Sequence, residues 1–139
     1  MNSPASAAVF YAFRLLPGED LLASLHTFVR EHRLQAGFVA GAVGSLSRAG
    51  LRFAGEPVAT RLDGCYELLS LQGTLDPEGA HLHAAISDPR GAVIGGHVME
   101  GCIVRTTMEL VIGSLSAVRF SRAFCPLSTY DELQVGPSA

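Results

Sequence analysis

The sequence contains no lysine: all ten of its basic residues are arginine, spread singly along the chain from Arg14 to Arg122. With 13 acidic residues, the formal net charge is −3. Neutralisation of phosphates by basic side chains supplies most of the affinity of nucleic-acid-binding proteins. An acidic chain without a basic stripe is therefore a weak nucleic-acid binder when isolated, although symmetric assembly could gather several arginines onto one surface.

Cysteines and long apolar runs are also scarce. Cys65, Cys102 and Cys125 form no C-x-x-C pair, and this pattern is typical of reduced thiols in a cytoplasm. No stretch approaches the roughly 20 apolar residues of a membrane span, and Met1–Ala8 lacks the basic start of a signal peptide. We expect a cytoplasmic protein without membrane contact. Its 48% of hydrophobic residues must be buried in a core, a subunit interface or both.

A length of 139 residues fits one domain and is too short for two domains of ordinary size. The sequence has no internal repeat and no low-complexity segment. We therefore predict a single domain over residues 8–133, with flexible tails at residues 1–7 and 134–139.

Helical periodicity occurs once, and it predicts an amphipathic helix over Glu19–Leu34. Strand patterns occupy most of the remainder, with breaks that include Ser47–Ala49 and Asp63-Gly64. The fold class is therefore α+β: a mainly antiparallel, strongly curved sheet of seven or eight strands with one long covering helix. The segments with strand patterns are Val9–Leu15, Phe38–Leu46, Gly50–Phe53, Pro57–Arg61, Tyr66–Leu75, His81–Ser87, Ala92–Val98, Ile103–Ile112 and Val118–Phe124.

Three histidines form the most informative constellation. His81 and His83 are two residues apart on a predicted strand, so both imidazoles point to one face of the sheet. With His97 on the next strand, they make the ligand set of an open Zn²⁺ site, although imidazole also suits other divalent metals. Alternatively, the three are polar strand residues on a solvent-exposed face of the sheet or at a subunit contact.

The strand register tests the metal hypothesis. A two-residue turn at Pro89-Arg90 would pair His97 with Leu82 and point its ring away from the other two histidines. A shared face requires an odd-length loop or a one-residue bulge, for which Gly95-Gly96 is a candidate. The histidines His26 and His32 lie on the predicted helix and are interpreted as surface residues.

Two acidic residues, Glu67 and Glu109, lie mid-strand among apolar neighbours. A buried carboxylate needs a partner, and either could accept a hydrogen bond from a ligand histidine or act as a general base. Arg105 could orient an anionic substrate. We take Glu67, Glu109 and Arg105 as candidate catalytic residues. The alternative is an intersubunit ion pair of either glutamate with Arg52 or Arg105.

Six segments in order, between about Ala8 and Leu133, resemble the bacterial PPC domain (plants-and-prokaryotes conserved domain). They are Arg14–Leu21, Ala36–Phe38 leading to Gly41–Leu46, Tyr66–Thr74, Gly79–His83, Val93–His97 and Glu100–Val104. The resemblance implies a compact α/β fold that is usually a homotrimer. The fold also resembles that of acetolactate decarboxylase, a zinc enzyme that likewise uses an H-x-H pair and a later histidine.

The resemblance also bears on function. Plant PPC domains accompany AT-hook motifs and mediate protein association, whereas bacterial members stand alone as predicted DNA-binding proteins. This chain has no Arg-Gly-Arg-Pro hook, and plant members generally lack its three histidines. We therefore predict a homotrimer whose divalent-metal site, foremost for zinc, binds a small anionic molecule; as an enzyme it would be a lyase or hydrolase. The alternatives are a non-catalytic regulatory or DNA-associated module and a purely structural assembly.

Overall fold

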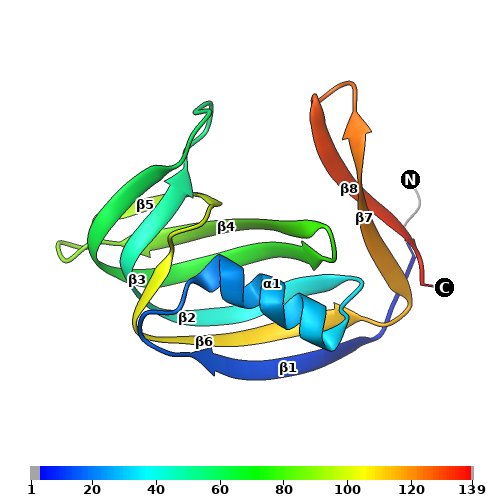
Figure 1. The fold of residues 1–139 in the computed structure, drawn as a ribbon, viewed down its shortest axis with the longest axis horizontal. Helices are drawn as coiled ribbons and strands as arrows, with labels where there is room; N and C mark the ends of the chain where they lie inside the picture. The colour runs from blue at the N-terminus through cyan, green and yellow to red at the C-terminus, as the bar shows by residue number, and fades with distance from the viewer. Residues whose placement is uncertain (1–3, 139) are drawn as a thin grey trace.

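A computed structural model describes residues 4–138 of the chain, which fold into one helix and eight strands (Figure 1). The elements are β1 (Ala8–Leu15), α1 (Leu21–His32), β2 (Gly37–Arg52), β3 (Thr60–Asp76), β4 (Gly79–Ser87), β5 (Val93–Val98), β6 (Ile103–Leu115), β7 (Val118–Cys125) and β8 (Tyr130–Pro137). None of the described residues form a helix with the length and apolar character that crossing a membrane requires.

Six of the strands form one antiparallel sheet in the order β1-β6-β2-β3-β4-β5. The sheet curls until the end of β2 also pairs with β5, where Leu51 lies opposite Val98 and Arg52 opposite His97. Strands β7 and β8 form a separate hairpin that projects from one end of the sheet (Figure 1). The predicted antiparallel, curved sheet with one covering helix is therefore confirmed, but its strands are divided between two sheets.

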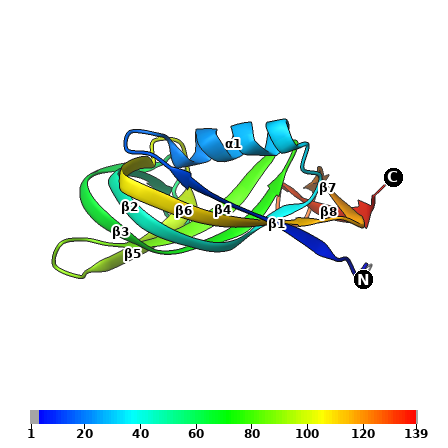
Figure 2. The same cartoon turned by 90° about the horizontal axis from the view of Figure 1, so that it is seen from below.

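Helix α1 covers one face of the large sheet (Figure 2). The carboxylate of Asp20 caps its first turn by accepting a hydrogen bond of 2.9 Å from the backbone N–H of Ala23. The side chains of Leu21, Leu25 and Val29 are buried against the sheet. The helix is shorter than predicted by two residues at each end, because Asp20 is the cap and Arg33 adopts the left-handed conformation that closes it.

The opposite side of the sheet, which we call the outer face, has no helix over it (Figure 2). On β6, Met108 and Leu110 are buried in the core beneath α1, so the alternating residues Glu109 and Val111 point to the outer face. Val43 of β2 pairs with Glu109 and is also exposed. The outer face therefore presents apolar side chains that nothing in the single chain covers.

Two predicted breaks lie inside long strands. At Ser47–Ala49, β2 runs on with a register shift between Leu46 and Arg48, so a bulge stands where a turn was predicted. At Asp63-Gly64, β3 also continues, and the exposed Asp63 carboxylate there pairs with Arg48 across the strands and with Arg61. Turn-forming residues thus occur within both strands, and the pairing of β2 with β3 continues on either side of them.

The chain ends differ in part from the predicted tails. Strand β8 extends to Pro137, so residues 134–137 belong to a hairpin that the sequence analysis did not predict. At the other end, residues 4–7 lie outside the strands, although Ser6 and Ala7 hydrogen-bond to the turn after β6. Residues 1–3 and 139 lie outside the described part of the chain.

Candidate metal site

The two histidines of β4 share a face, as alternation along the strand predicted. Leu82, Ala84 and Ile86 of the same strand are buried in the core beneath α1. The intervening His81 and His83 therefore point to the outer side of the sheet and are exposed. Burial of one face of β4 fixes this register, since a slip of one residue would expose the three apolar side chains.

His97 joins them through the register of the next strand pair. It lies directly opposite His83, and the last pair of this hairpin is Ser87 with Val93. The connecting loop is therefore residues 88–92, an odd number, which brings His97 onto the shared face. The pairing is regular throughout, so the alternative route through a bulge at Gly95-Gly96 is not the one used.

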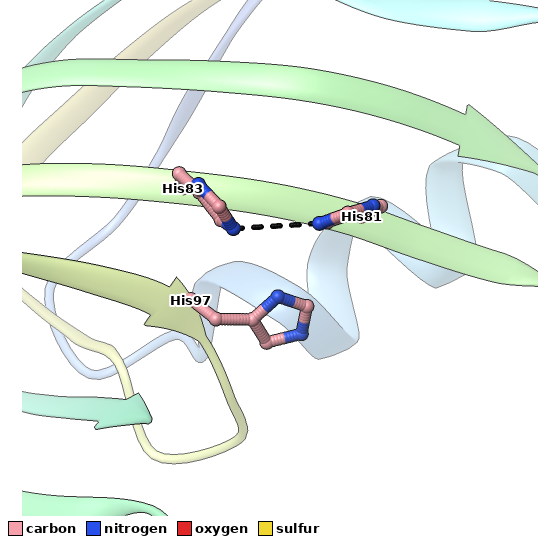
Figure 3. Close-up of side chains that lie close together, drawn as sticks. All are labelled: His81, His83 and His97. Atoms are coloured by element: carbon pink, nitrogen blue, oxygen red, sulfur yellow. Dashed lines mark hydrogen bonds between the residues drawn. The ribbon is translucent and has the colours of Figure 1, made fainter. Parts of the chain in front are cut away.

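The ring nitrogens converge (Figure 3). The Nε2 atoms of His81 and His83 are 3.3 Å apart, and one ligand nitrogen from each of the three rings lies within 4.8 Å of the others. Two nitrogens bound to one tetrahedral zinc at 2.0–2.1 Å would lie about 3.3–3.4 Å apart. The spacing of the first pair, and the choice of three imidazoles, thus fit a divalent metal that keeps one open position.

Electrostatics favours the neutral, metal-binding form of two of the rings. Burial lowers the pKa of His97 to about 4, and the positive charge of Arg52 acts in the same direction. Burial also lowers the pKa of His81, with a smaller contribution from His83. A metal binds the unprotonated imidazole, so both rings are in the required form at neutral pH.

Three pockets meet at the histidines. The one that touches all three has a volume of about 510 Å³, and its apolar lining is Phe53, Ala54 and small residues of β4 and β5. Its polar lining, besides the histidines, is Arg52, Ser70 and Gln72. A small molecule in this pocket would therefore contact one cation, two neutral polar groups and the open side of the metal site.

The β7–β8 hairpin borders the site on its other side. Arg122 of β7 and Glu132 of β8 line a pocket together with His81 and His83. The Arg122 guanidinium donates two hydrogen bonds to the buried Asp76 carboxylate, at 2.9 and 3.0 Å, and one of 3.1 Å to Thr74 Oγ1. Glu132 lies close enough to His81 to oppose the lowering of its pKa. This ion pair anchors the hairpin beside the histidines and leaves Glu132 facing them.

A glycine lets the neighbouring strand approach the site. Gly73 of β3 lies opposite Leu82 and has a φ of +143°, in a region that favours glycine. A β-carbon at this position would overlap the carbonyl oxygen of His81. The close approach of β3 to β4 at the first ligand histidine therefore depends on the absence of a side chain there.

The three candidate catalytic residues lie elsewhere in the single chain. Glu67 and Glu109 are exposed on β3 and β6, although the sequence placed them among apolar neighbours; Arg105 is exposed on β6. None of the three lines any of the three pockets described above, which the histidines share with other residues of the described chain. The alternation of long strands explains the exposure, since Glu109 lies between the buried Met108 and Leu110.

Sequence reasoning did not assign two residues that the structure brings to the site, Arg52 and Glu132. Arg52 precedes a loop far from the histidines in sequence and arrives because β2 closes onto β5. Glu132 arrives on the β7–β8 hairpin, and β8 was not predicted. Neither residue carries a local motif, so only the long-range pairing could have revealed them.

Comparison with known families decides where the fold belongs. Residues 3–116 match the model of the Plants and Prokaryotes Conserved (PCC) domain, the family also abbreviated PPC. The chain belongs to the PCC domain family. The resemblance of the six sequence segments is therefore confirmed.

Several solved structures superpose on this chain. A hypothetical protein from Salmonella cholerae-suis is 51% identical, with a TM-score of 0.97 over 99% of this chain and 100% of its own. A metal-containing protein from Archaeoglobus fulgidus is 22% identical, with a TM-score of 0.82 over 96% and 99%. A protein from Bacteroides thetaiotaomicron, described as a candidate DNA-binding protein, is 19% identical, with a TM-score of 0.78 over 90% and 91%. At these last two identities, the likeness shows the fold alone.

Curated relatives are much longer than this PCC chain. A protein named bifunctional protein GlmU, from Synechococcus sp. (strain JA-3-3Ab), is 45% identical over 132 residues. The match covers 95% of this chain but only 21% of that protein, so the chain spans about a fifth of its length. A PCC-like segment thus occurs there as one part of a larger protein.

Proposed function

We propose that this PCC protein is a cytoplasmic homotrimer that binds a small anionic molecule at a zinc site formed by His81, His83 and His97. The observation that carries the proposal is the convergence of three imidazoles beside a pocket. A related fold is found in a protein described as metal-containing, which agrees with a metal in this one. The resemblance to acetolactate decarboxylase that we expect from the sequence would agree with such a site, because that enzyme also uses an H-x-H pair and a later histidine.

The chemistry follows from the residues around the site. A divalent metal held by the three histidines would supply Lewis acidity to a carbonyl or phosphoryl oxygen of the ligand. Glu132 faces His81 and can accept a proton from a ligand or water in the pocket. Arg52 offers positive charge beside His97. Lyase and hydrolase reactions both fit this arrangement of a proton acceptor, a cation and an open metal position.

The proposed trimer buries part of the outer face. A row of cross-strand neighbours runs over this face from Phe10 through Gly113, Phe38 and Thr74 to His81. The rings of Phe10 and Phe38 make an edge-to-face contact at 6.1 Å, and 58% of Phe10 remains exposed. A neighbouring copy that covered the aromatic end of this row would lie next to the histidines at its other end.

In such an assembly the candidate catalytic residues have a role. Glu67, Glu109 and Arg105 are exposed in the single chain. We propose that they meet a neighbouring copy, where they could reach its site or form intersubunit ion pairs. Either role makes their effect depend on assembly, so it should disappear in a variant that remains monomeric.

Metal analysis of protein purified without a histidine tag tests the site. We expect about one zinc per wild-type chain and nearly none in His83→Ala, because two imidazoles hold the metal much less tightly than three. His26→Ala is the matched control, since it removes an exposed histidine of α1. The trimer, measured by light scattering, should persist in both variants, because His83 contributes no core packing.

Two results would refute the metal site. One is wild-type protein without stoichiometric metal even after incubation with excess zinc. The other is metal that stays bound when His81, His83 and His97 are each replaced. A monomer at micromolar concentration would refute the trimer separately, leaving the metal assignment standing.

A second candidate function is a regulatory or DNA-associated interaction module without catalysis. It is favoured by structural neighbours described as candidate DNA-binding proteins and by the occurrence of a PCC-like segment within a larger protein. We expect duplex DNA to bind the isolated chain weakly or not at all at physiological salt, since the net charge is −3 and lysine is absent. Tight, sequence-selective binding in a salt-titrated assay would favour this alternative.

A further inference from the structure

We infer that the ligand of this site is a small carboxylate and that Arg52 binds its carboxylate group. The inference rests on the metal site proposed above and names the chemical class of its ligand. It also moves the anion-binding role from Arg105, which the sequence suggested, to an arginine that lies beside the histidines.

Arg52 is placed by the closure of the sheet. It is the last residue of β2 and lies directly opposite His97 in the β2–β5 pairing. Side chains directly opposite each other in an antiparallel pair project to the same face, with β-carbons about 4.5–5.5 Å apart. Arg52 and His97 also line the same two pockets. The backbone therefore places the Arg52 side chain on the same face as the metal ligands, and the shared pocket lining keeps it beside them.

The two arginines near the histidines differ in their partners. The guanidinium of Arg122 already donates hydrogen bonds to Asp76 and Thr74. Arg52 is only half-buried, and within residues 4–138 it has no ion pair and no side-chain hydrogen bond. Its donors are thus available to a ligand, while those of Arg122 are occupied by the fold.

The lining of the pocket favours an anion with a single charge. In the 510 Å³ pocket that touches all three histidines, Arg52 is the single charged lining residue, and no carboxylate of the described chain lines it. A guanidinium matches a carboxylate through two parallel hydrogen bonds. A phosphate would bring more charge and more acceptor oxygens than one arginine satisfies.

Gln72 and Ser70 complete the polar lining. Gln72 pairs with His83 across β3 and β4, and Ser70 pairs with Ala85 one step along the same face. Both can donate to or accept from a neutral oxygen of the ligand. The pocket therefore fits a short carboxylate with a second oxygen function, in which the carboxylate meets Arg52 and the other oxygen faces the metal position. Hydroxy and oxo carboxylates have this composition.

A titration of cobalt-loaded protein tests the inference. Cobalt content per chain is measured first, and the visible absorption is then followed as lactate is added to the wild type and to Arg52→Gln, Arg52→Lys, Arg105→Gln and Arg90→Gln. We expect Arg52→Gln to retain cobalt but bind lactate at least tenfold more weakly. Arg52→Lys should bind lactate with an intermediate affinity, because lysine keeps the positive charge but cannot donate two parallel hydrogen bonds to the carboxylate. Arg90→Gln is the control, since Arg90 is exposed in the β4–β5 loop and lines none of these pockets.

The outcomes separate the inference from the metal site itself. Wild-type protein that holds no cobalt would refute the proposed function before any lactate is added. Cobalt-loaded protein that binds lactate equally well in the wild type and in Arg52→Gln would overturn the role of Arg52 alone. An effect confined to Arg105→Gln, or loss of cobalt from Arg52→Gln, would do the same. Equal or tighter binding of inorganic phosphate or of lactamide, the neutral analogue, would overturn the carboxylate assignment.

Discussion

Two polar clusters lie side by side at one end of the large sheet, and they are built in opposite ways. The cluster of Asp76 and Arg122 is closed: the Asp76 side chain is fully buried, and the Arg122 guanidinium is satisfied by it and by Thr74. The histidine cluster is open, because two of its three rings are exposed and their nitrogens mainly face one another.

The difference distinguishes polar side chains that stabilise the fold from polar side chains that can bind a ligand. A buried, fully hydrogen-bonded ion pair fixes the relative position of the elements that carry it, here β3 and the β7–β8 hairpin. The histidine rings contact mainly one another, so they do not fix the position of other elements and are available to a ligand. We therefore expect substitutions in the first cluster to affect stability and substitutions in the second to affect binding.

The largest expected effect is that of Arg122→Ala. The variant would leave the Asp76 carboxylate buried without its partner, which costs about 3–5 kcal/mol in comparable ion pairs. Urea denaturation at fixed protein concentration measures the loss. Arg119→Ala, on the same strand but exposed, is the matched control and should change the free energy of unfolding by less than about 0.5 kcal/mol. Equal losses in the two variants would contradict the structural role of the ion pair.

A smaller loss is expected from Gly73→Ala, which links the two clusters. The residue combines a φ of +143° with an overlap between the new β-carbon and the His81 carbonyl oxygen, so we expect a loss of about 1–3 kcal/mol. The shift of β4 should also weaken zinc binding, measured by competition with a chelator. Gly79→Ala lies in the same hairpin with open space around it and should leave both quantities unchanged. Full zinc affinity in a destabilised Gly73→Ala protein would show that the two clusters are independent.

Local sequence patterns predicted some of these features and not others. The alternation of β4 predicted the shared face of His81 and His83, and the helical periodicity predicted α1, because both patterns arise from local geometry. The turn residues Asp63-Gly64 were misleading, because β3 continues through them while it pairs with β2, and this pairing joins residues that are separated in sequence. The position of Arg52 beside His97 depends on how the sheet closes, which no local pattern encodes.

An intermediate effect is expected when the pH is lowered in metal-free protein. The pKa of His97 is lowered to about 4, mainly by burial, whereas an unfolded histidine titrates near 6.5. Between these values the unfolded state binds the additional proton, so stability falls as the pH drops from about 6.5 to 4, and this contribution is absent above 6.5. The free energy of unfolding of the wild type minus that of His97→Asn, measured from pH 4 to 8, should follow this course. A flat difference would contradict the burial of the ring.

The smallest expected effect is on the stability of metal-free His83→Ala. The side chain is exposed and makes no core contact, so the free energy of unfolding should change by less than about 0.5 kcal/mol. With zinc present, the wild type should gain stability by binding the metal, and the variant should not. A loss of several kcal/mol in the free energy of unfolding of the metal-free variant would show that the histidines stabilise the fold, as Asp76 and Arg122 do.

The loop at residues 88–92 has a consequence for comparing this chain with its relatives. The Asp88 carboxylate holds the loop by accepting hydrogen bonds from the backbone N–H groups of Arg90 and Ala92, both at 2.9 Å. Its odd length determines the side of the sheet on which His97 lies. An insertion or deletion of one residue would turn that histidine away, so a homologue could keep all three histidine codons and still lose the site. Loop parity, rather than histidine count, is therefore the criterion for recognising relatives that share this chemistry.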